Sequence, residues 1–322
     1  MHPTHRDNLL NHRQVILYDM AMTQSLANFR RSMPMEGTLN FRDLGGYVTN
    51  GNKHVVPRRI FRSANLSQIT ASDIETLQSL GINTVIDFRG PKESQDNPDR
   101  LPPGTDYYNS PVIGTSAGDN IDDYTISQLV KAASLPDSML EKDKVLKHGP
   151  YYRMLYLVNS YGSEAHVNML RAYRPLFQKL LTFPQESNLL FHCTGGRDRT
   201  GVGAALLLKT LGVADDAIEA DFVASNTWLQ PDRDEPDSTR FLCFHSANVF
   251  LQPSANKRFQ RVAQSLCTTP DRIRGAVELR PELLRRMFQA VDTKYGSFDA
   301  FLNQELGIDA DKRAHLKRLY TL

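Results

Sequence analysis

Short apolar runs and amphipathic stretches alternate along much of the chain. Thr70 and Asp73 have the spacing of a helix N-terminal cap, and apolar side chains then recur at helical spacing until Gly81. A β-branched run at residues 84–88 follows at once, and a second apolar run at 189–192 leads through a glycine-rich stretch into an apolar helix. Helices that alternate with short buried strands are typical of an α/β fold, which we therefore predict.

Turn and cap residues predict further elements on either side of these strands. Asn50 and Gly51 form a hairpin-type turn between two short apolar stretches. Near the carboxyl end, Pro281 suits the first turn of a helix, and Ser297 and Asp309 suit the caps of two more. The first of these helices has one apolar face, which we expect in the core: Leu284, Met287, Phe288 and Val291.

Three polar segments lie outside this pattern. We interpret residues 1–35 as an N-terminal extension and residues 231–257 as a surface insertion. The long segment 111–174 adds no predicted core strand and contains a cluster of tyrosines, so we interpret it as a helical lid. A pair of solvated helices that packs on the side of the domain is an equal alternative. The length of 322 residues fits one enlarged domain or two ordinary ones.

Composition and charge argue against several classes of protein. Hydrophobic residues make up 40% of the chain and charged residues 23%, which is ordinary for a packed globular protein and excludes wholesale disorder. The 38 Lys and Arg against 36 Asp and Glu leave a net charge of +2, so we expect no nucleic-acid partner. The longest apolar run, 201–208, is too short for stable membrane insertion, and we identify no signal peptide. We expect a cytoplasmic protein, with export without a classical signal peptide as the alternative.

The chain has three cysteines, Cys193, Cys243 and Cys267, and no C-x-x-C pair. An odd and widely spaced set argues against a disulfide scaffold and against a structural zinc site. Cys243 and His245 form a candidate metal pair, but no second pair accompanies them. We therefore interpret Cys243 and Cys267 as ordinary loop or core thiols, and we predict no metal site.

The segment from His192 to Gly201, with the sequence HCTGGRDRTG, has the residue types of a nucleophilic, anion-binding loop. Its glycines allow several backbone N–H groups to turn inward at the positive end of the following helix. Arg199, six residues after Cys193, can bind two phosphate oxygens, and the same positive field favours the nucleophilic thiolate of Cys193. We predict that a phosphate binds to this loop: Thr194, Gly195, Gly196, Arg197, Asp198, Arg199 and Thr200.

These residues predict hydrolysis of a phosphomonoester with no metal and no other cofactor. Cys193 would attack phosphorus to form a phosphocysteine, Arg199 and the loop amides would hold the equatorial oxygens, and water would complete the reaction. We assign Asp198 as general acid and then base, with Asp87 at the end of the other strand as the competing acid. Thr200 is expected to donate its hydroxyl to the Cys193 sulfur.

Other polar residues are expected to support this loop. His192 directly precedes the nucleophile, and we expect it to buttress the loop without titrating in the reaction. Asp87 and Arg89 flank Phe88, where a simple charge pair at the strand end is an equal alternative. The residues that we assign as loop supports or alternative acids are Asp87, His192, Arg42 and Asp43.

At these residues the chain resembles the cysteine-dependent protein tyrosine phosphatase superfamily, and in particular the LipA-like, mycobacterial protein-B-like bacterial tyrosine phosphatases. The loop of that group reads approximately H-C-x-x-G-K-D-R-T-G, and Arg197 stands here in place of the lysine. Further blocks that resemble the group follow in order along the chain: 40–47, 62–66, 87–89, 221–226 and 295–298. The likeness covers residues 36–322 and favours one domain that carries insertions.

The resemblance implies a central, largely parallel sheet with helices on both faces, and a helical lid over residues 111–174. It also implies that Cys193 is the nucleophile, Arg199 the phosphate ligand and Asp198 the general acid. Arginine in place of a lysine linked to phospholipid headgroups argues against phosphoinositides. Because the tyrosine-rich lid can line a pocket for an aromatic leaving group, we expect a phosphotyrosine protein or a small aryl phosphate as substrate. A dual-specificity or phosphoinositide phosphatase is one alternative; a catalytically silent phosphate-binding module and a sulfurtransferase are two others.

Overall fold

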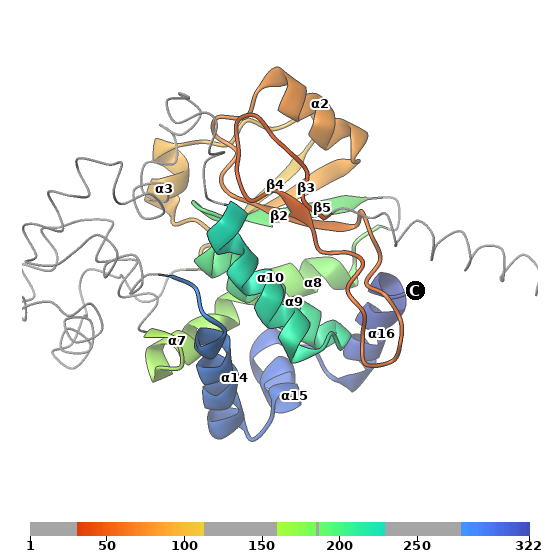
Figure 1. The fold of residues 1–322 in the computed structure, drawn as a ribbon, viewed down its shortest axis with the longest axis vertical. Helices are drawn as coiled ribbons and strands as arrows, with labels where there is room; N and C mark the ends of the chain where they lie inside the picture. Colours follow the sequence, from red (N-terminus) through yellow and green to blue (C-terminus); the bar gives the residue numbers. More distant parts are fainter. Residues whose placement is uncertain (1–30, 113–159, 185–186, 229–277) are drawn as a thin grey trace, which may run out of the picture.

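A five-stranded sheet lies at the centre of the computed structural model, which describes residues 31–112, 160–184, 187–228 and 278–322 (Figure 1). The strands follow the order β1-β2-β5-β3-β4. Their bounds are β1 (Arg42–Asp43), β2 (Ile60–Ser63), β3 (Ile82–Asp87), β4 (Asp106–Asn109) and β5 (Asn188–His192). β1 pairs antiparallel with β2, and every other pair is parallel, which confirms the predicted sheet.

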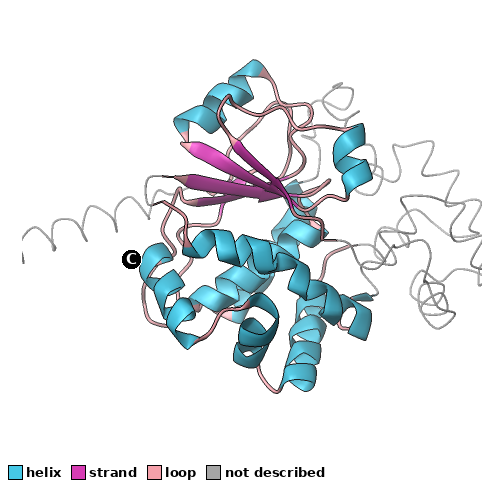
Figure 2. Cartoon of the chain, turned by 180° about the vertical axis from the view of Figure 1, so that it is seen from behind, coloured by secondary structure: helices cyan, strands magenta, loops and turns pink. Residues whose placement is uncertain are grey.

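Helices cover both faces of the sheet, as predicted (Figure 2). On one side lies α2 (Ala71–Ser79), with α3 (Pro91–Asp96) near the carboxyl end of β3. The other helices lie on the opposite side: α7 (Glu164–Met169), η2 (Leu170–Tyr173), α8 (Arg174–Leu181), α9 (Asp198–Leu211), α10 (Asp215–Trp228), α14 (Pro281–Tyr295), α15 (Phe298–Phe301), η4 (Leu302–Leu306) and α16 (Ala310–Tyr320).

Alternating side chains of the strands fill two separate cores. Leu189 and Phe191 of β5 belong to the larger core, beneath the helices that follow α3 in the chain. Leu190, between them, packs with Leu77 of α2 in a smaller core on the other face. This period of two places one face of each central strand in each core, so the central strand β5 is fixed from both sides.

The predicted capping residues are confirmed. Thr70 accepts from the Asp73 N–H and Asp73 accepts from the Thr70 N–H, which completes the capping box of α2. Ser297 and Asp309 cap α15 and α16 by accepting from the N–H groups of Ala300 and Lys312, without a reciprocal bond. The hairpin-type turn is also present, since the Val55 N–H donates to the Tyr47 carbonyl at 2.9 Å, although the flanking residues form only isolated bridges.

The described end of the predicted N-terminal extension belongs to the body of the domain. Arg31 donates to the Gly45 carbonyl at 3.0 Å, and its guanidinium lies 3.8 Å from the centre of the Tyr47 ring. Met33 and Met35 pack against the smaller core. Residues 31–35 therefore pack against the body of the domain, whereas residues 1–30 lie outside the described residues.

The end of the predicted lid also packs into the body. Val167, Leu170 and Tyr173 are buried in the larger core, so residues 160–174 pack as part of the body of the domain. The polar residues between them are exposed, and they make the sequence pattern here similar to that of a surface insertion. The rest of the predicted lid and the insertion at 231–257 lie outside the described residues, as do Cys243, His245 and Cys267.

Among the described residues, no helix combines the length and the apolar character that crossing a membrane requires.

Candidate active site

The predicted nucleophilic loop begins where the central strand of the sheet ends. β5 finishes at His192, which pairs in register with Ser63 of β2 and Asp87 of β3, and Cys193 is the next residue. The carboxyl ends of parallel strands form the edge where α/β folds bind ligands. Cys193 is only 3% exposed, so its thiol lies at the bottom of the loop.

The loop presents backbone N–H groups that have no acceptor. Those of Thr194, Gly195, Gly196 and Asp198 donate to no other residue that the structure describes. α9 starts at Asp198, so the partial positive charge of its N-terminus lies in the same place. Unpaired N–H groups at a helix N-terminus form a binding site for an anion such as phosphate. We call these four N–H groups the cradle, because they are available to an anion.

Arg199 is held beside the loop by a carboxylate that the sequence did not point to. Its Nη1 and Nη2 atoms each lie 2.8 Å from an oxygen of Glu93, in the first turn of α3. The Thr194 hydroxyl donates to the same carboxylate at 2.7 Å. This fork-to-fork pair fixes the plane of the guanidinium, whose Nε donates to no described residue.

The electrostatics of this pair keep both groups ionised. Burial opposes ionisation of Glu93, but the hydrogen bonds and charge of Arg199 lower the pKa of Glu93 to about 2. Burial also opposes the charge on Arg199, yet the hydrogen bonds of Glu93 and the charges of Cys193 and Glu93 raise its pKa above the usual value. Arg199 is thus a permanent cation beside the thiol.

Asp198 is the first residue of α9 and stands five positions after Cys193. Its carboxylate accepts from Arg197 Nε at 3.1 Å and its side chain is 15% exposed, so it remains accessible. Burial raises the pKa of Tyr161, and the charges of Asp198 and Cys193 raise it further. Tyr161 is 3% exposed and stacks on His166, so this tyrosine of the predicted lid lies in the core.

Asp87 does not have the geometry of a competing acid. It is fully buried, and both of its oxygens are occupied by Arg89, with the Tyr107 hydroxyl donating to one of them at 2.7 Å. The alternative of a charge pair at the strand end therefore describes Asp87 and Arg89 correctly. A carboxylate with no exposed oxygen cannot reach a leaving group, so Asp87 is a structural support.

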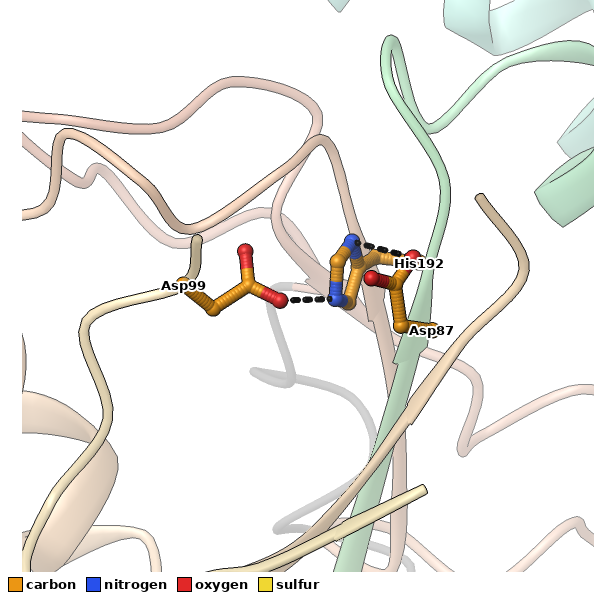
Figure 3. Close-up of side chains that lie close together, drawn as sticks. All are labelled: Asp87, Asp99 and His192. Carbon is orange, nitrogen blue, oxygen red and sulfur yellow. Dashed lines mark ion pairs between the residues drawn. The ribbon is translucent and has the colours of Figure 1, made fainter. Parts of the chain in front are cut away.

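His192 joins this network from the strand side (Figure 3). Its Nε2 lies 3.0 Å from Asp99 Oδ2, and its Nδ1 lies 3.2 Å from the Cys193 carbonyl oxygen. Burial alone would lower the pKa of His192, but the charge and hydrogen bond of Asp99 raise it. The imidazole is buried and contacts the loop through the Cys193 carbonyl.

Asp87, Asp99 and His192 offer atoms close enough together to hold a metal ion, but a cation of the protein already occupies that role. Nη2 of Arg89 lies 2.8 Å from Asp87 and 2.9 Å from Asp99. A buried guanidinium between two carboxylates offsets part of their charge and occupies the space that a cation would need. We interpret the cluster as an internal ion-pair network.

Two further residues predicted as supports have different surroundings. Arg42 is buried and contacts Asp221 through Nε at 2.9 Å and Asn40 through Nη1, next to the loop. Asp43 points to a turn instead: its oxygens accept from the N–H groups of Gly45 at 2.7 Å and Arg58 at 2.5 Å. Burial raises the pKa of Asp43 to about 6. Asp43 stabilises that turn and is not an alternative acid.

The predicted hydrogen bond from Thr200 to the Cys193 sulfur is not formed in this structure. The Thr200 hydroxyl is buried and makes no hydrogen bond with any described residue. Thr200 lies in the first turn of α9, directly after Arg199. Its hydroxyl is a free donor beside the cradle.

Sequence reasoning missed several residues that fix the loop, namely Glu93, Asp99, Asn65 and Tyr173. Glu93 had a local signal, because it stands three residues after Gly90 and accepts from the Gly90 N–H as a helix cap does. Nothing in the spacing could connect Glu93 with Arg199, which is 106 positions away. Tyr173 also contacts the loop from far along the chain, since its hydroxyl donates to the Arg199 carbonyl at 2.6 Å.

Comparisons with known proteins agree with this site. The family model described as "Tyrosine phosphatase family" matches residues 33–322. The chain is 29% identical over 288 residues to a Cupriavidus necator protein named "Putative tyrosine-protein phosphatase", covering 89% of this chain and 88% of the relative. It is 28% identical over 277 residues to the "Triple specificity protein phosphatase PtpB" of Mycobacterium tuberculosis, covering 84% and 92%. The match to most of the chain shows that this protein belongs to the tyrosine phosphatase family.

Proposed function

We propose that this phosphatase hydrolyses phosphomonoesters, with phosphotyrosine as its main target, through a phosphocysteine on Cys193. One observation carries the proposal: a buried thiol starts a loop in which four N–H groups have no acceptor among the described residues, beside an arginine fixed in one plane. Phosphate is the anion that this combination of oriented donors and a bidentate guanidinium fits best.

The reaction divides into two displacements at phosphorus. The Cys193 thiolate forms the S–P bond while the bond to the leaving oxygen breaks, and Asp198 gives that oxygen its proton. The loop N–H groups and Arg199 hold the three equatorial oxygens, where the negative charge gathers. Asp198, now a carboxylate, then takes a proton from water as that water attacks phosphorus, which releases phosphate and restores the thiolate.

The geometry of Arg197 supports an aryl phosphate over a phosphoinositide. Arg197 is 3% exposed, and its Nε is held by Asp198 at 3.1 Å. A buried, paired guanidinium is a poor receptor for the additional phosphates of an inositide headgroup, whereas an exposed lysine would reach them. We therefore place phosphotyrosine proteins and small aryl phosphates ahead of phosphoinositides, with dual specificity as the second candidate because the mycobacterial relative carries the name of a triple specificity phosphatase.

A substrate panel tests this proposal. We expect the kcat/KM of a phosphotyrosine peptide and of p-nitrophenyl phosphate to exceed that of phosphoserine peptides and phosphoinositides, with or without a chelator. Comparable values for phosphoinositides would contradict the preference, and loss of activity with the chelator would contradict the metal-free mechanism. Tight phosphopeptide binding without any turnover would instead identify a phosphate-binding module.

Asp198→Asn tests the general acid. The change keeps the size of the side chain but removes its proton, so we expect a loss that depends on the leaving group. For phenyl phosphate, whose phenoxide needs protonation, kcat should fall about 100-fold more than for p-nitrophenyl phosphate. Equal losses for both esters would assign the proton to another group. Melting temperatures separate this effect from the lost contact with Arg197.

Glu93→Gln tests how Arg199 is fixed. The amide cannot form the fork-to-fork ion pair, so we expect kcat/KM to fall about 10-fold through misorientation of the guanidinium. Glu219→Gln is the matched control, because Glu219 forms a similar pair with Arg285 on exposed helices away from the loop. The control should lose no activity; equal losses in both variants would contradict the role of Glu93.

The difference in stability between wild type and Glu93→Gln should depend on pH. The pKa of Glu93 is lowered from its ordinary 4.5 to about 2 in the folded protein. Its stabilising contribution is therefore complete above about pH 4.5 and is lost as the pH falls toward 2. Denaturation curves should show wild type more stable than Glu93→Gln at neutral pH, with the gap closing through this window. A gap that does not change with pH would contradict the ion pair.

A further inference from the structure

Two carbonyl groups of the phosphate-binding loop are held by donors from other parts of the chain. The Gly196 carbonyl accepts from Asn40 Nδ2 at 2.7 Å and from Arg62 Nη2 at 2.8 Å. The Thr194 carbonyl accepts from the backbone N–H and the Nδ2 of Asn65, both at 3.1 Å. None of these three residues belongs to the loop. A donor group that binds a loop carbonyl cannot bind a phosphate at the same time.

These hydrogen bonds to the carbonyl oxygens also fix the direction of the N–H groups in the same peptide units. In a trans peptide, the carbonyl of one residue and the N–H of the next point in opposite directions, and the described residues contain no cis peptide. Holding the Thr194 carbonyl outward therefore turns the Gly195 N–H inward. Asn40 Nδ2 also lies 3.4 Å from the Gly195 carbonyl oxygen, and holding that oxygen outward does the same for the Gly196 N–H. Holding the Gly196 carbonyl fixes the next peptide, which leads into α9.

The donors are themselves fixed by a buried network. Nη1 of Arg62 lies 2.5 Å from Asp221 of α10, which also binds Arg42 at 2.9 Å. Arg42 in turn donates to both oxygens of Asn40, which leaves the Asn40 amide nitrogen aimed at the loop. Arg42, Arg62 and Asp221 are at most 3% exposed. Through this network, α10 and β2 hold the loop in place from the side of its carbonyl groups.

We propose that Asn40, Arg62 and Asn65 are positioning residues that keep the N–H groups of the cradle turned toward the phosphoryl oxygens. Their effect is on catalysis more than on binding, since oriented N–H groups gain most where charge accumulates in the transition state. Without them the peptide units of a glycine-rich loop can rotate, because glycine permits both orientations. This inference rests on the proposed phosphatase reaction.

The test removes one carbonyl anchor at a time. Asn65→Ala removes the side-chain donor to Thr194 and leaves the backbone donor, while Asn40→Gly removes the donor to Gly196 and tolerates the local φ of 61°. Asn83→Ala is the matched control, since the exposed amide of Asn83 donates to Ser187 Oγ at the opposite end of β3. Each protein is assayed for kcat, KM, melting temperature and the inhibition constants of orthovanadate and inorganic phosphate.

We expect each anchor variant to lose about 10-fold in kcat with a small change in KM, and to bind vanadate about 10-fold more weakly. Phosphate affinity should change less, and the control should stay within twofold in every measurement. Unchanged vanadate affinity in folded variants would overturn the proposal, as would losses explained by the unfolded fraction. If Asn40→Gly fails to fold, the kcat and vanadate affinity of Asn65→Ala alone test the proposal. A wild type that neither hydrolyses phosphoesters nor binds vanadate would instead refute the proposed function.

Discussion

Cys193→Ser should abolish turnover while the protein still binds phosphate. A serine hydroxyl at the end of β5 has nearly the same size as the thiol but is not ionised near neutral pH, so no nucleophile is present to form the S–P bond. We expect kcat for p-nitrophenyl phosphate to fall by about 10⁴-fold or more. The N–H groups of the loop and Arg199 do not change, so calorimetry should find phosphate affinity within a few-fold of wild type.

The other two cysteines provide the control for this experiment. Cys243→Ser and Cys267→Ser should keep near-normal activity, because the sequence around them contains neither a glycine loop nor an arginine six residues later. Acid quenching during turnover of labelled substrate should trap a phosphoenzyme in wild type and in both controls. Near-normal hydrolysis by Cys193→Ser would refute the phosphocysteine mechanism on Cys193.

Local features of the sequence predicted local features of the fold correctly. The capping box of Thr70 and Asp73 starts α2, and Gly212, with a φ of 90°, ends α9 where the apolar run stops. Such signals depend only on residues within one turn of each other, so tertiary packing does not change the element that they predict. The loop from Cys193 to Arg199 was predictable for the same reason, because strand, glycines and helix follow one another directly.

Contacts between distant segments were beyond the reach of spacing arguments. Glu93 fixes Arg199, and Asp99 pairs with His192, only because the ends of β3 and β5 meet at one edge of the sheet. Sequence reasoning named Asp87 as the other acid on the basis of that edge, but it could not see that Arg89 and Tyr107 occupy both oxygens. Proximity to a site is predictable from topology, whereas the partner of each carboxylate is decided by packing.

Gly196→Ala should damage both the fold and the activity, for a reason that depends on close approach. Gly196 has a φ of 61°, and a Cβ there would lie 2.3 Å from the Ser63 oxygen and 2.6 Å from the Ala64 nitrogen. Both are backbone atoms at the end of β2 and cannot rotate away, so the loop itself must move by about 1 Å. Because both anchors of its carbonyl would shift as well, we expect kcat to fall about 100-fold or more.

Gly296→Ala is the control that separates the steric clash at Gly196 from the energetic cost of placing alanine in a left-handed backbone conformation. Gly296 has a φ of 83°, but a Cβ there meets no atom within 4 Å. Both variants carry about 1 kcal/mol of strain from a left-handed backbone, and only Gly196→Ala adds about 1–3 kcal/mol from overpacking. Urea denaturation should therefore show the larger loss for Gly196→Ala, with full activity in Gly296→Ala. Equal losses of stability, with activity retained in both, would mean that the loop can move away from β2 without disturbing the cradle.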